Sequence, residues 1–301
     1  MKTILVKGPA LSRSGYGEQT RFALRALRAY ESRFNILLVN IPWGQTGWIA
    51  ESGEERDWYD QILAKGHVHM QQQLPVDISL QVTIPNEWEK IAPINIGYTA
   101  GIETTKVAPH WIEKSRLMDK IIVVSNHSKN VFNNTVYQGQ IEQTGEEVEF
   151  RNQTPIEVVN YPVRSLEKEK LDIKLEYDFN FLAVAQMGPR KNIPNTVYWF
   201  IDEFHNEEVG LVLKTNIRNC STQDCANTKQ QLKSIIDQYP DRKCKIYLLH
   251  GDLTLEEMNS LYANKNIKSF VTFTHGEGFG MPIFEAAYHG LPVIAPAWSG
   301  Q

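Results

Sequence analysis

A glycine-rich run near the end of the chain carries the clearest chemistry in the sequence. Residues 275–287 read HGEGFGMPIFEAA and lead from an apolar run into a helical pattern. Glycines remove side chains where backbone amides could approach a ligand, and a helix N-terminus favours an anion such as phosphate. Glu277 and Glu285 flank this run, and their carboxylates can accept hydrogen bonds from sugar hydroxyls. This combination fits a nucleotide sugar, although Glu285 is equally explained as a favourable charge in a first helical turn.

Residues 276–301 resemble the family 4 glycosyltransferases, which have the GT-B fold. That family's pattern has an acidic Gly-Phe-Gly-x-Pro run, a Glu-Ala helix and then Gly-x-Pro-Val-Ile. The chain has GFGMP at 278–282, EA at 285–286 and GLPVI at 290–294. The resemblance implies that Glu277 contacts the donor sugar and that Glu285 binds the ribose hydroxyls. It also places Gly278 in the donor site, with the amides of Phe279 and Gly280 near the phosphates.

Further parts of the second half also resemble this family. Residues 184–192 resemble the strand-end segment that supplies two cations to the donor diphosphate, which implies this role for Lys191 and Arg190. A solvated basic pair is the alternative interpretation. Residues 250–253 resemble the loop that touches the base, so we expect Gly251 in the donor site. Residues 254–262 resemble the family's Glu-Glu-x-x-x-Leu-Tyr helix.

The first half offers two candidates. Gly15 and Gly17 link the first strand to the first helix, and the resemblance implies that a glycine here approaches the donor phosphate. A glycine turn that merely packs is the alternative. Glu103 follows a strand's C-terminal end, where α/β sheets place ligands, and could orient the acceptor or stabilise positive charge at the anomeric carbon. Glu103 and Glu277 are therefore the predicted catalytic residues.

Short β-branched runs that alternate with helical patterns predict an α/β fold with parallel sheets. We expect two Rossmann-like domains that face a cleft, as in GT-B enzymes. An acceptor-side domain spans 1–161, a charge-dense linker spans 162–178, and a nucleotide-sugar domain spans 179–301. No helix is predicted after the last strand pattern at 291–295, so the second domain is expected to be truncated. The acidic stretch 139–155 is expected to be an extended hairpin or a mobile loop.

Composition excludes several classes of protein. The 301 residues carry a net charge of −4, and 42% are hydrophobic, which is ordinary for a globular chain and untypical of a nucleic-acid binder. Three cysteines cannot build a disulfide framework, and no run suits a signal peptide or a transmembrane segment, which favours the cytoplasm. The sequence has no Asp-x-Asp metal clamp and no Cys-x-x-Cys pair.

The sequence therefore predicts a glycosyltransferase that moves a sugar from a nucleotide-diphosphate sugar to an acceptor hydroxyl on a saccharide or another molecule. It needs no further cofactor and no metal, and the resemblance implies retention of configuration. Two alternatives stay open. One is a non-catalytic nucleotide-sugar-binding or scaffold protein of the same fold, and the other is a nucleotide-sugar epimerase.

Overall fold

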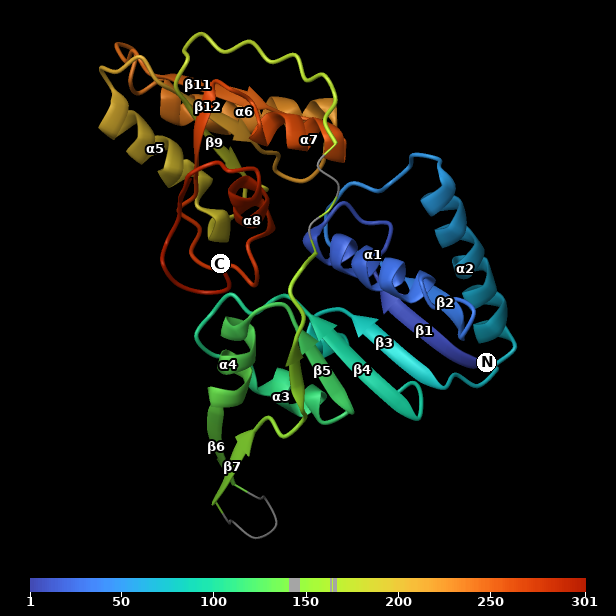
Figure 1. Cartoon of the computed structure of the whole chain (residues 1–301). Helices are drawn as coiled ribbons and strands as arrows, with labels where there is room; N and C mark the ends of the chain where they lie inside the picture. Colours follow the sequence, from blue (N-terminus) through green and yellow to red (C-terminus); the bar gives the residue numbers. More distant parts are fainter. Residues whose placement is uncertain (141–146, 163, 165–166) are drawn as a thin grey trace. The chain divides into compact units, whose positions relative to one another are not determined.

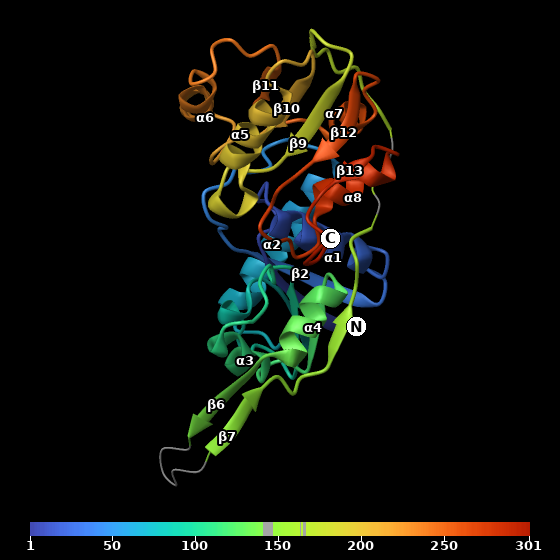
Figure 2. The same cartoon turned by 90° about the vertical axis from the view of Figure 1, so that its left-hand side faces the viewer.

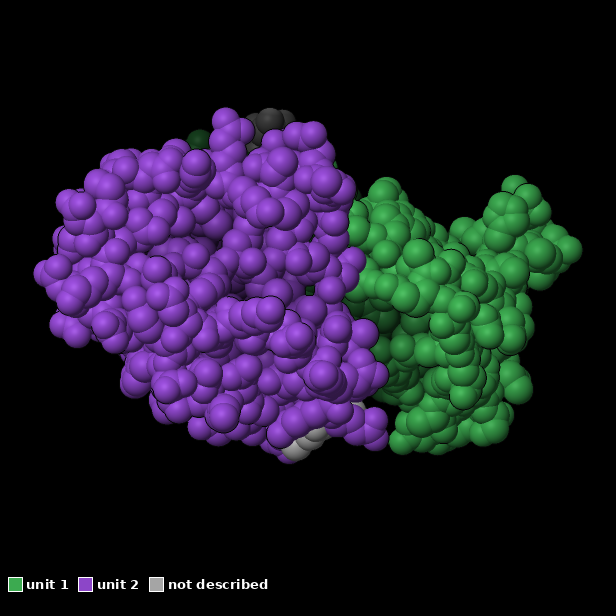
Figure 3. All heavy atoms as spheres, turned by 90° about the horizontal axis from the view of Figure 1, so that it is seen from above, with its two compact units in different colours: residues 1–162, 300 green, residues 163–299, 301 purple. Residues whose placement is uncertain are grey.

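Two units, each with its own parallel sheet, make up the chain. The computed structural model describes residues 1–140, 147–162, 164 and 167–301. Unit 1 comprises residues 1–162 with Gly300, and unit 2 comprises residues 163–299 with Gln301, as coloured in Figure 3. Figures 1 and 2 show the strands and helices of each unit.

The sheet of unit 1 has six strands in the order β2-β1-β3-β4-β5-β8, and every neighbouring pair is parallel. Its strands are β1 (Lys2–Gly8), β2 (Phe34–Asn40), β3 (Ile78–Val82), β4 (Ile94–Thr99), β5 (Lys120–Val123) and β8 (Ile156–Val158). Strands buried on both faces read as continuous apolar runs, and β1 and β2 contain such runs.

Helices connect these parallel strands. They are α1 (Gly15–Arg28), α2 (Glu54–Gln71), α3 (Pro109–Ser115) and α4 (Asn126–Asn134), with a short 3₁₀ turn η1 (Pro85–Glu87). Ser14 and Ser125 cap α1 and α4, because each hydroxyl accepts from a backbone amide three residues on. Trp88, Phe132 and Ile121 are buried together in the core beside α3 and α4.

A two-stranded hairpin also belongs to unit 1. Its strands β6 (Val136–Gln140) and β7 (Glu147–Arg151) pair antiparallel, with Tyr137 opposite Phe150. This confirms the expected extended hairpin within 139–155 for the residues that the structure describes, whereas residues 141–146 lie outside them.

The sheet of unit 2 has five parallel strands in the order β11-β10-β9-β12-β13. These are β9 (Asn180–Val184), β10 (Gly210–Lys214), β11 (Lys245–Leu249), β12 (Ile267–Val271) and β13 (Val293–Ile294). The connecting helices are α5 (Ile193–Phe204), α6 (Thr222–Ile236), α7 (Leu255–Tyr262) and α8 (Met281–Tyr288), and a 3₁₀ turn η2 (Pro189–Lys191) precedes α5. The strand order reverses between β9 and β12, which is where α/β sheets place ligands.

The segment predicted as a linker is partly built into unit 2. Leu171, Ile173 and Leu175 pack against the unit's core, while the residues between them are exposed. Two helix α7 side chains also hold this segment, since Asn259 donates to the Glu167 carbonyl at 2.8 Å and Ser260 donates to the Glu169 carbonyl. Residues 167–178 therefore behave as an extended strap on unit 2, and their alternation of apolar and charged residues is the sequence feature that indicates it.

Candidate functional site

The loop before α8 and the turn after β9 meet at one edge of the unit 2 sheet, because β9 and β12 are neighbours whose carboxyl ends lie together. Glu277, in this loop, is buried. Its carboxylate contacts the Lys191 ammonium at 2.5 Å and the Arg190 guanidinium at 3.1 Å. The structure thus brings together three of the residues that the sequence predicts for the donor site. They form a cationic group with one buried carboxylate at its centre.

Backbone hydrogen bonds fix this group in place. Arg190 donates to the Gly276 carbonyl at 2.7 Å, and its own carbonyl accepts from the His275 amide at 2.8 Å. The Asn192 side chain donates to the Phe273 carbonyl at 3.1 Å, and the Glu277 amide donates to the Ser299 hydroxyl at 3.0 Å. The basic pair is therefore locked to the glycine-rich loop, which argues against a merely solvated pair.

Helix α8 begins directly after the glycine-rich run. Gly280 is its N-cap and has φ +83°, a left-handed conformation that side chains rarely adopt, so glycine is required there. Pro282 lies in the first turn, where its missing amide hydrogen removes no helical hydrogen bond. Residues 278–280 thus lead to the helix end where the sequence places a phosphate.

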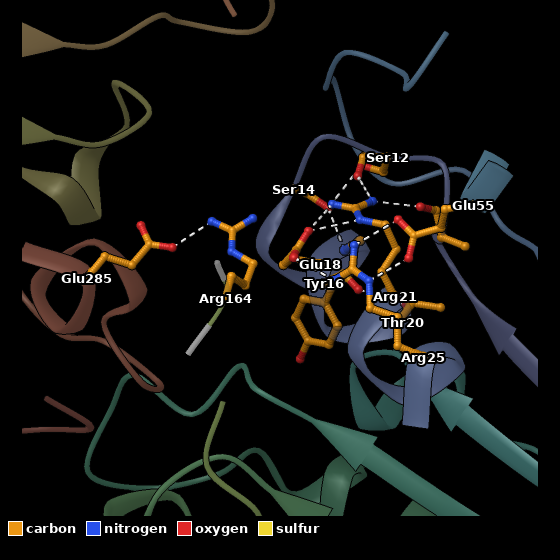
Figure 4. A network of polar contacts seen from close by, with 12 residues as sticks. Ser12, Ser14, Tyr16, Glu18, Thr20, Arg21, Arg25, Glu55, Arg164 and Glu285 are labelled. Carbon is orange, nitrogen blue, oxygen red and sulfur yellow. Dashed lines mark hydrogen bonds and ion pairs between the residues drawn. The ribbon is translucent and has the colours of Figure 1, made fainter. Parts of the chain in front are cut away.

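The Glu285 carboxylate, on α8, has a partner on each oxygen. The Tyr262 hydroxyl donates to Oε2 at 3.1 Å. The Arg164 guanidinium donates to Oε1 at 2.6 Å, as Figure 4 shows. The side chains of Glu285 and Arg164 are about one-fifth and one-quarter exposed, whereas Tyr262 is buried. Burial raises the pKa of Tyr262 well above its ordinary value, and the nearby carboxylate raises it further. The sequence gives no indication of the Arg164 contact, because 121 positions separate the two residues.

Gly251 lies in the loop after β11, next to the loop that follows the neighbouring strand β10. This glycine has φ +107°, and its carbonyl accepts from the Lys214 ammonium at 2.5 Å. The Asp224 carboxylate joins the loops, because it accepts from His250 at 3.0 Å and from backbone amides of residues 217–219. Burial alone would raise the pKa of Asp224, but these hydrogen bonds outweigh it and hold the pKa below its ordinary value. The loop predicted to touch a base is thus braced by a buried acid that no local sequence pattern indicates.

In unit 1, Gly15 is the first residue of α1, and no described atom lies within 4 Å of a side-chain carbon placed on it. Gly17 differs, because the same carbon would lie 2.0 Å from the Ser12 carbonyl oxygen. Gly17 is therefore explained by close packing against the loop, whereas the backbone at Gly15 stays open to a ligand.

An ion-pair network holds the loop before α1, and Figure 4 shows it. The buried Arg21 donates to the Ala10 and Ser12 carbonyls at 2.6 and 2.9 Å, and it pairs with Glu18 at 2.7 Å. Arg25 extends the network from Glu18 to Glu55 on α2. The Glu-x-x-Arg spacing in α1 is the sequence feature that indicates such a pair.

Glu103 lies in the loop after β4 and is partly buried. Tyr16 reaches the same loop, since its hydroxyl contacts Thr99 Oγ1 at 2.7 Å and accepts from the Ala100 amide. Burial raises the pKa of Tyr16 to about 12 despite these hydrogen bonds, and the negative charge of Glu103 contributes. Glu103 therefore belongs to a strand-end group of unit 1, and Glu277 belongs to unit 2.

Among the described residues, no group of three or more His, Cys, Asp or Glu side chains could hold a metal ion. None of the helices in the described part of the chain combines the length and apolar character needed to cross a membrane.

Solved structures resemble the chain over its whole length. One is HepE from Anabaena in complex with UDP-glucose, with a TM-score of 0.61, 14% identity, and coverage of 100% of this chain and 82% of that one. A trehalose-6-phosphate protein from E. coli bound with UDP-2-fluoro glucose has a TM-score of 0.60 at 10% identity, with 100% and 85% covered. A glycosyltransferase from Rickettsia africae has a TM-score of 0.58 at 14% identity, with 100% and 80% covered.

No protein-family model matches the sequence, and no curated protein matches it. The structural likeness concerns the fold, because the identities are low. The chain has the α/β fold of the GT-B glycosyltransferases, with a parallel sheet in each unit.

Proposed function

We propose that the chain transfers a sugar from a nucleotide-diphosphate sugar to an acceptor hydroxyl. The observation that carries this proposal is the buried Glu277 carboxylate with Lys191 and Arg190 on either side of it, at the carboxyl edge of the unit 2 sheet. Two of the solved structures with this fold hold UDP-sugars, which supports the same class of donor here.

Different residues of unit 2 would bind different parts of the donor. Lys191 and Arg190 would neutralise the diphosphate, together with the backbone of Gly278, Phe279 and Gly280 at the start of α8. Charge neutralisation of the leaving group would drive bond breaking without a metal ion. Attack by the acceptor hydroxyl on the same face would then retain the configuration.

Carboxylates would orient the sugar parts of the donor. Glu277 would accept from a hydroxyl of the transferred sugar, and Glu285 from the ribose hydroxyls. Gly251 would lie beside the base, and Gly15 would offer open backbone to the phosphate. Glu103 of unit 1 would orient the acceptor or stabilise charge at the anomeric carbon.

A cytoplasmic location belongs to the proposal, because three cysteines cannot build a disulfide framework.

Donor hydrolysis tests the proposal. The full chain is incubated with UDP-, ADP- and GDP-linked sugars, and the release of nucleoside diphosphate is measured with and without saccharide acceptors. We expect one donor to be hydrolysed slowly and Glu277→Gln to reduce the rate about 100-fold or more. Glu203→Gln is the matched control, because Glu203 is exposed on α5.

Three results would contradict the proposal. The release of a sugar isomer from intact donor would identify an epimerase. Binding of a nucleotide sugar without turnover would identify a non-catalytic protein. Failure of every nucleotide sugar to bind the folded chain would refute the assignment of a donor site in unit 2.

A further inference from the structure

Tyr262 is the last residue of α7, and its hydroxyl reaches across to α8. The residue is 2% exposed, and its hydroxyl donates to Glu285 Oε2 at 3.1 Å. Its ring also lies 5.4 Å from the ring of His289, the C-cap residue that follows α8. The tyrosine therefore contacts both the carboxylate and the end of the helix that bears it.

We infer that Tyr262 is a positioning residue that sets the orientation of the Glu285 carboxylate toward the ribose of a bound nucleotide. The inference rests on the proposed function, in which Glu285 binds ribose hydroxyls. A carboxylate on a two-carbon stem can rotate, and a buried hydroxyl donor on one oxygen fixes which oxygen faces the ligand.

The two partners of Glu285 differ in how firmly they are held. Tyr262 is enclosed in the core of unit 2, and its raised pKa keeps the phenol protonated, so that its hydrogen is always available. About one-quarter of the Arg164 side chain is exposed, so Arg164 is more open to solvent than the buried Tyr262. The hydrogen bond from Tyr262 to Oε2 would thus persist when a ligand binds, whereas a ligand hydroxyl could replace Arg164 at Oε1.

The backbone of Glu285 is also fixed. Its carbonyl accepts from the His289 amide at 3.1 Å and from His289 Nδ1 at 2.8 Å. With the backbone and Oε2 both held, Oε1 is the oxygen left to exchange Arg164 for a hydroxyl. Tyr262 would therefore control how well the site distinguishes ribose from deoxyribose, although it touches no ligand itself.

Calorimetry with matched nucleotides tests this inference. The dissociation constants of UDP, ADP and GDP and of their 2′-deoxy counterparts are measured for the wild type and Tyr262→Phe. Tyr247→Phe is the control, because the Tyr247 hydroxyl lies in the same unit and accepts from the Glu176 amide at 2.9 Å. We expect Tyr262→Phe to weaken the preferred ribonucleotide about three- to tenfold and to leave its deoxy form unchanged.

Each other outcome overturns the inference in a distinguishable way. Equal weakening of the ribo and deoxy forms would assign Tyr262 a structural role only, and unchanged affinities would assign it none at the site. Neither result would affect the donor site. Failure of all three ribonucleotides to bind the wild type would instead refute the proposed function, and the inference about Tyr262 would fall with it.

Discussion

Replacement of Lys191 by methionine should destabilise unit 2, because it removes a partner from a buried carboxylate. The Glu277 side chain is 9% exposed, and that of Lys191 is 19% exposed. Breaking a buried ion pair by removing one partner costs about 3–5 kcal/mol. Arg190 remains 3.1 Å from the other oxygen, so we expect a loss of about 2 kcal/mol in the free energy of unfolding.

A double-mutant cycle isolates this interaction. Thermal unfolding is measured for the wild type, Lys191→Met, Glu277→Gln and the double variant, and the first variant should melt about 4–8 °C lower. The double variant should recover about 1–2 kcal/mol relative to the sum of the single changes. Lys233→Met is the control, because the Lys233–Asp237 pair is mostly exposed and should contribute less than about 0.5 kcal/mol. Additive single changes, or a Lys191→Met protein as stable as the wild type, would refute the reasoning.

Three further predictions follow from the geometry. Gly17→Ala should destabilise unit 1 by about 2 kcal/mol or more in urea unfolding, because the new carbon meets the loop backbone at 2.0 Å, whereas Gly15→Ala should change stability by less than about 0.5 kcal/mol. The lowered pKa of Asp224 contributes stability above its unfolded pKa of about 3.9, so the wild type should lose stability as the pH falls below about 4. Melts at pH 3–7 should show a lower and flatter profile for Asp224→Asn, and parallel profiles would refute this. Arg164→Gln should tighten UDP binding several-fold in calorimetry, because the ribose would no longer compete with the Arg164 guanidinium for the Glu285 carboxylate. Weaker binding by this variant would instead indicate that Arg164 contacts the nucleotide.

Local patterns account for the parts of the fold that the sequence predicts. Parallel strands are buried on both faces, so each appears as a short apolar run, as at β9 and β10. The start of α8 is predicted for a similar reason, because glycines followed by Pro282 are typical of a helix N-terminus. Such features depend on neighbouring residues alone and can be recognised without knowledge of the fold.

The contacts that were missed join residues far apart in the chain. Arg164 meets Glu285 across 121 positions, and Asp224 meets His250 across 26, so neither pair has a spacing that indicates it. The packing of residues 167–178 on unit 2 is hard to predict for another reason. Their many charges are typical of a linker, whereas only the apolar residues at alternate positions from Leu171 to Leu175 indicate contact with the core.

The charges around Glu277 explain why stability and activity must be measured separately in this protein. Lys191 and Arg190 bring two positive charges to one buried carboxylate, so the group keeps a net positive charge for an incoming diphosphate. Without a donor, Glu277 compensates the cations and holds the glycine-rich loop to the turn after β9. With a donor, the diphosphate would share those cations and leave the carboxylate available to a sugar hydroxyl. A loss of activity in Glu277→Gln therefore identifies a catalytic role only if the melting curve shows that the variant keeps its fold, because the same carboxylate would support both.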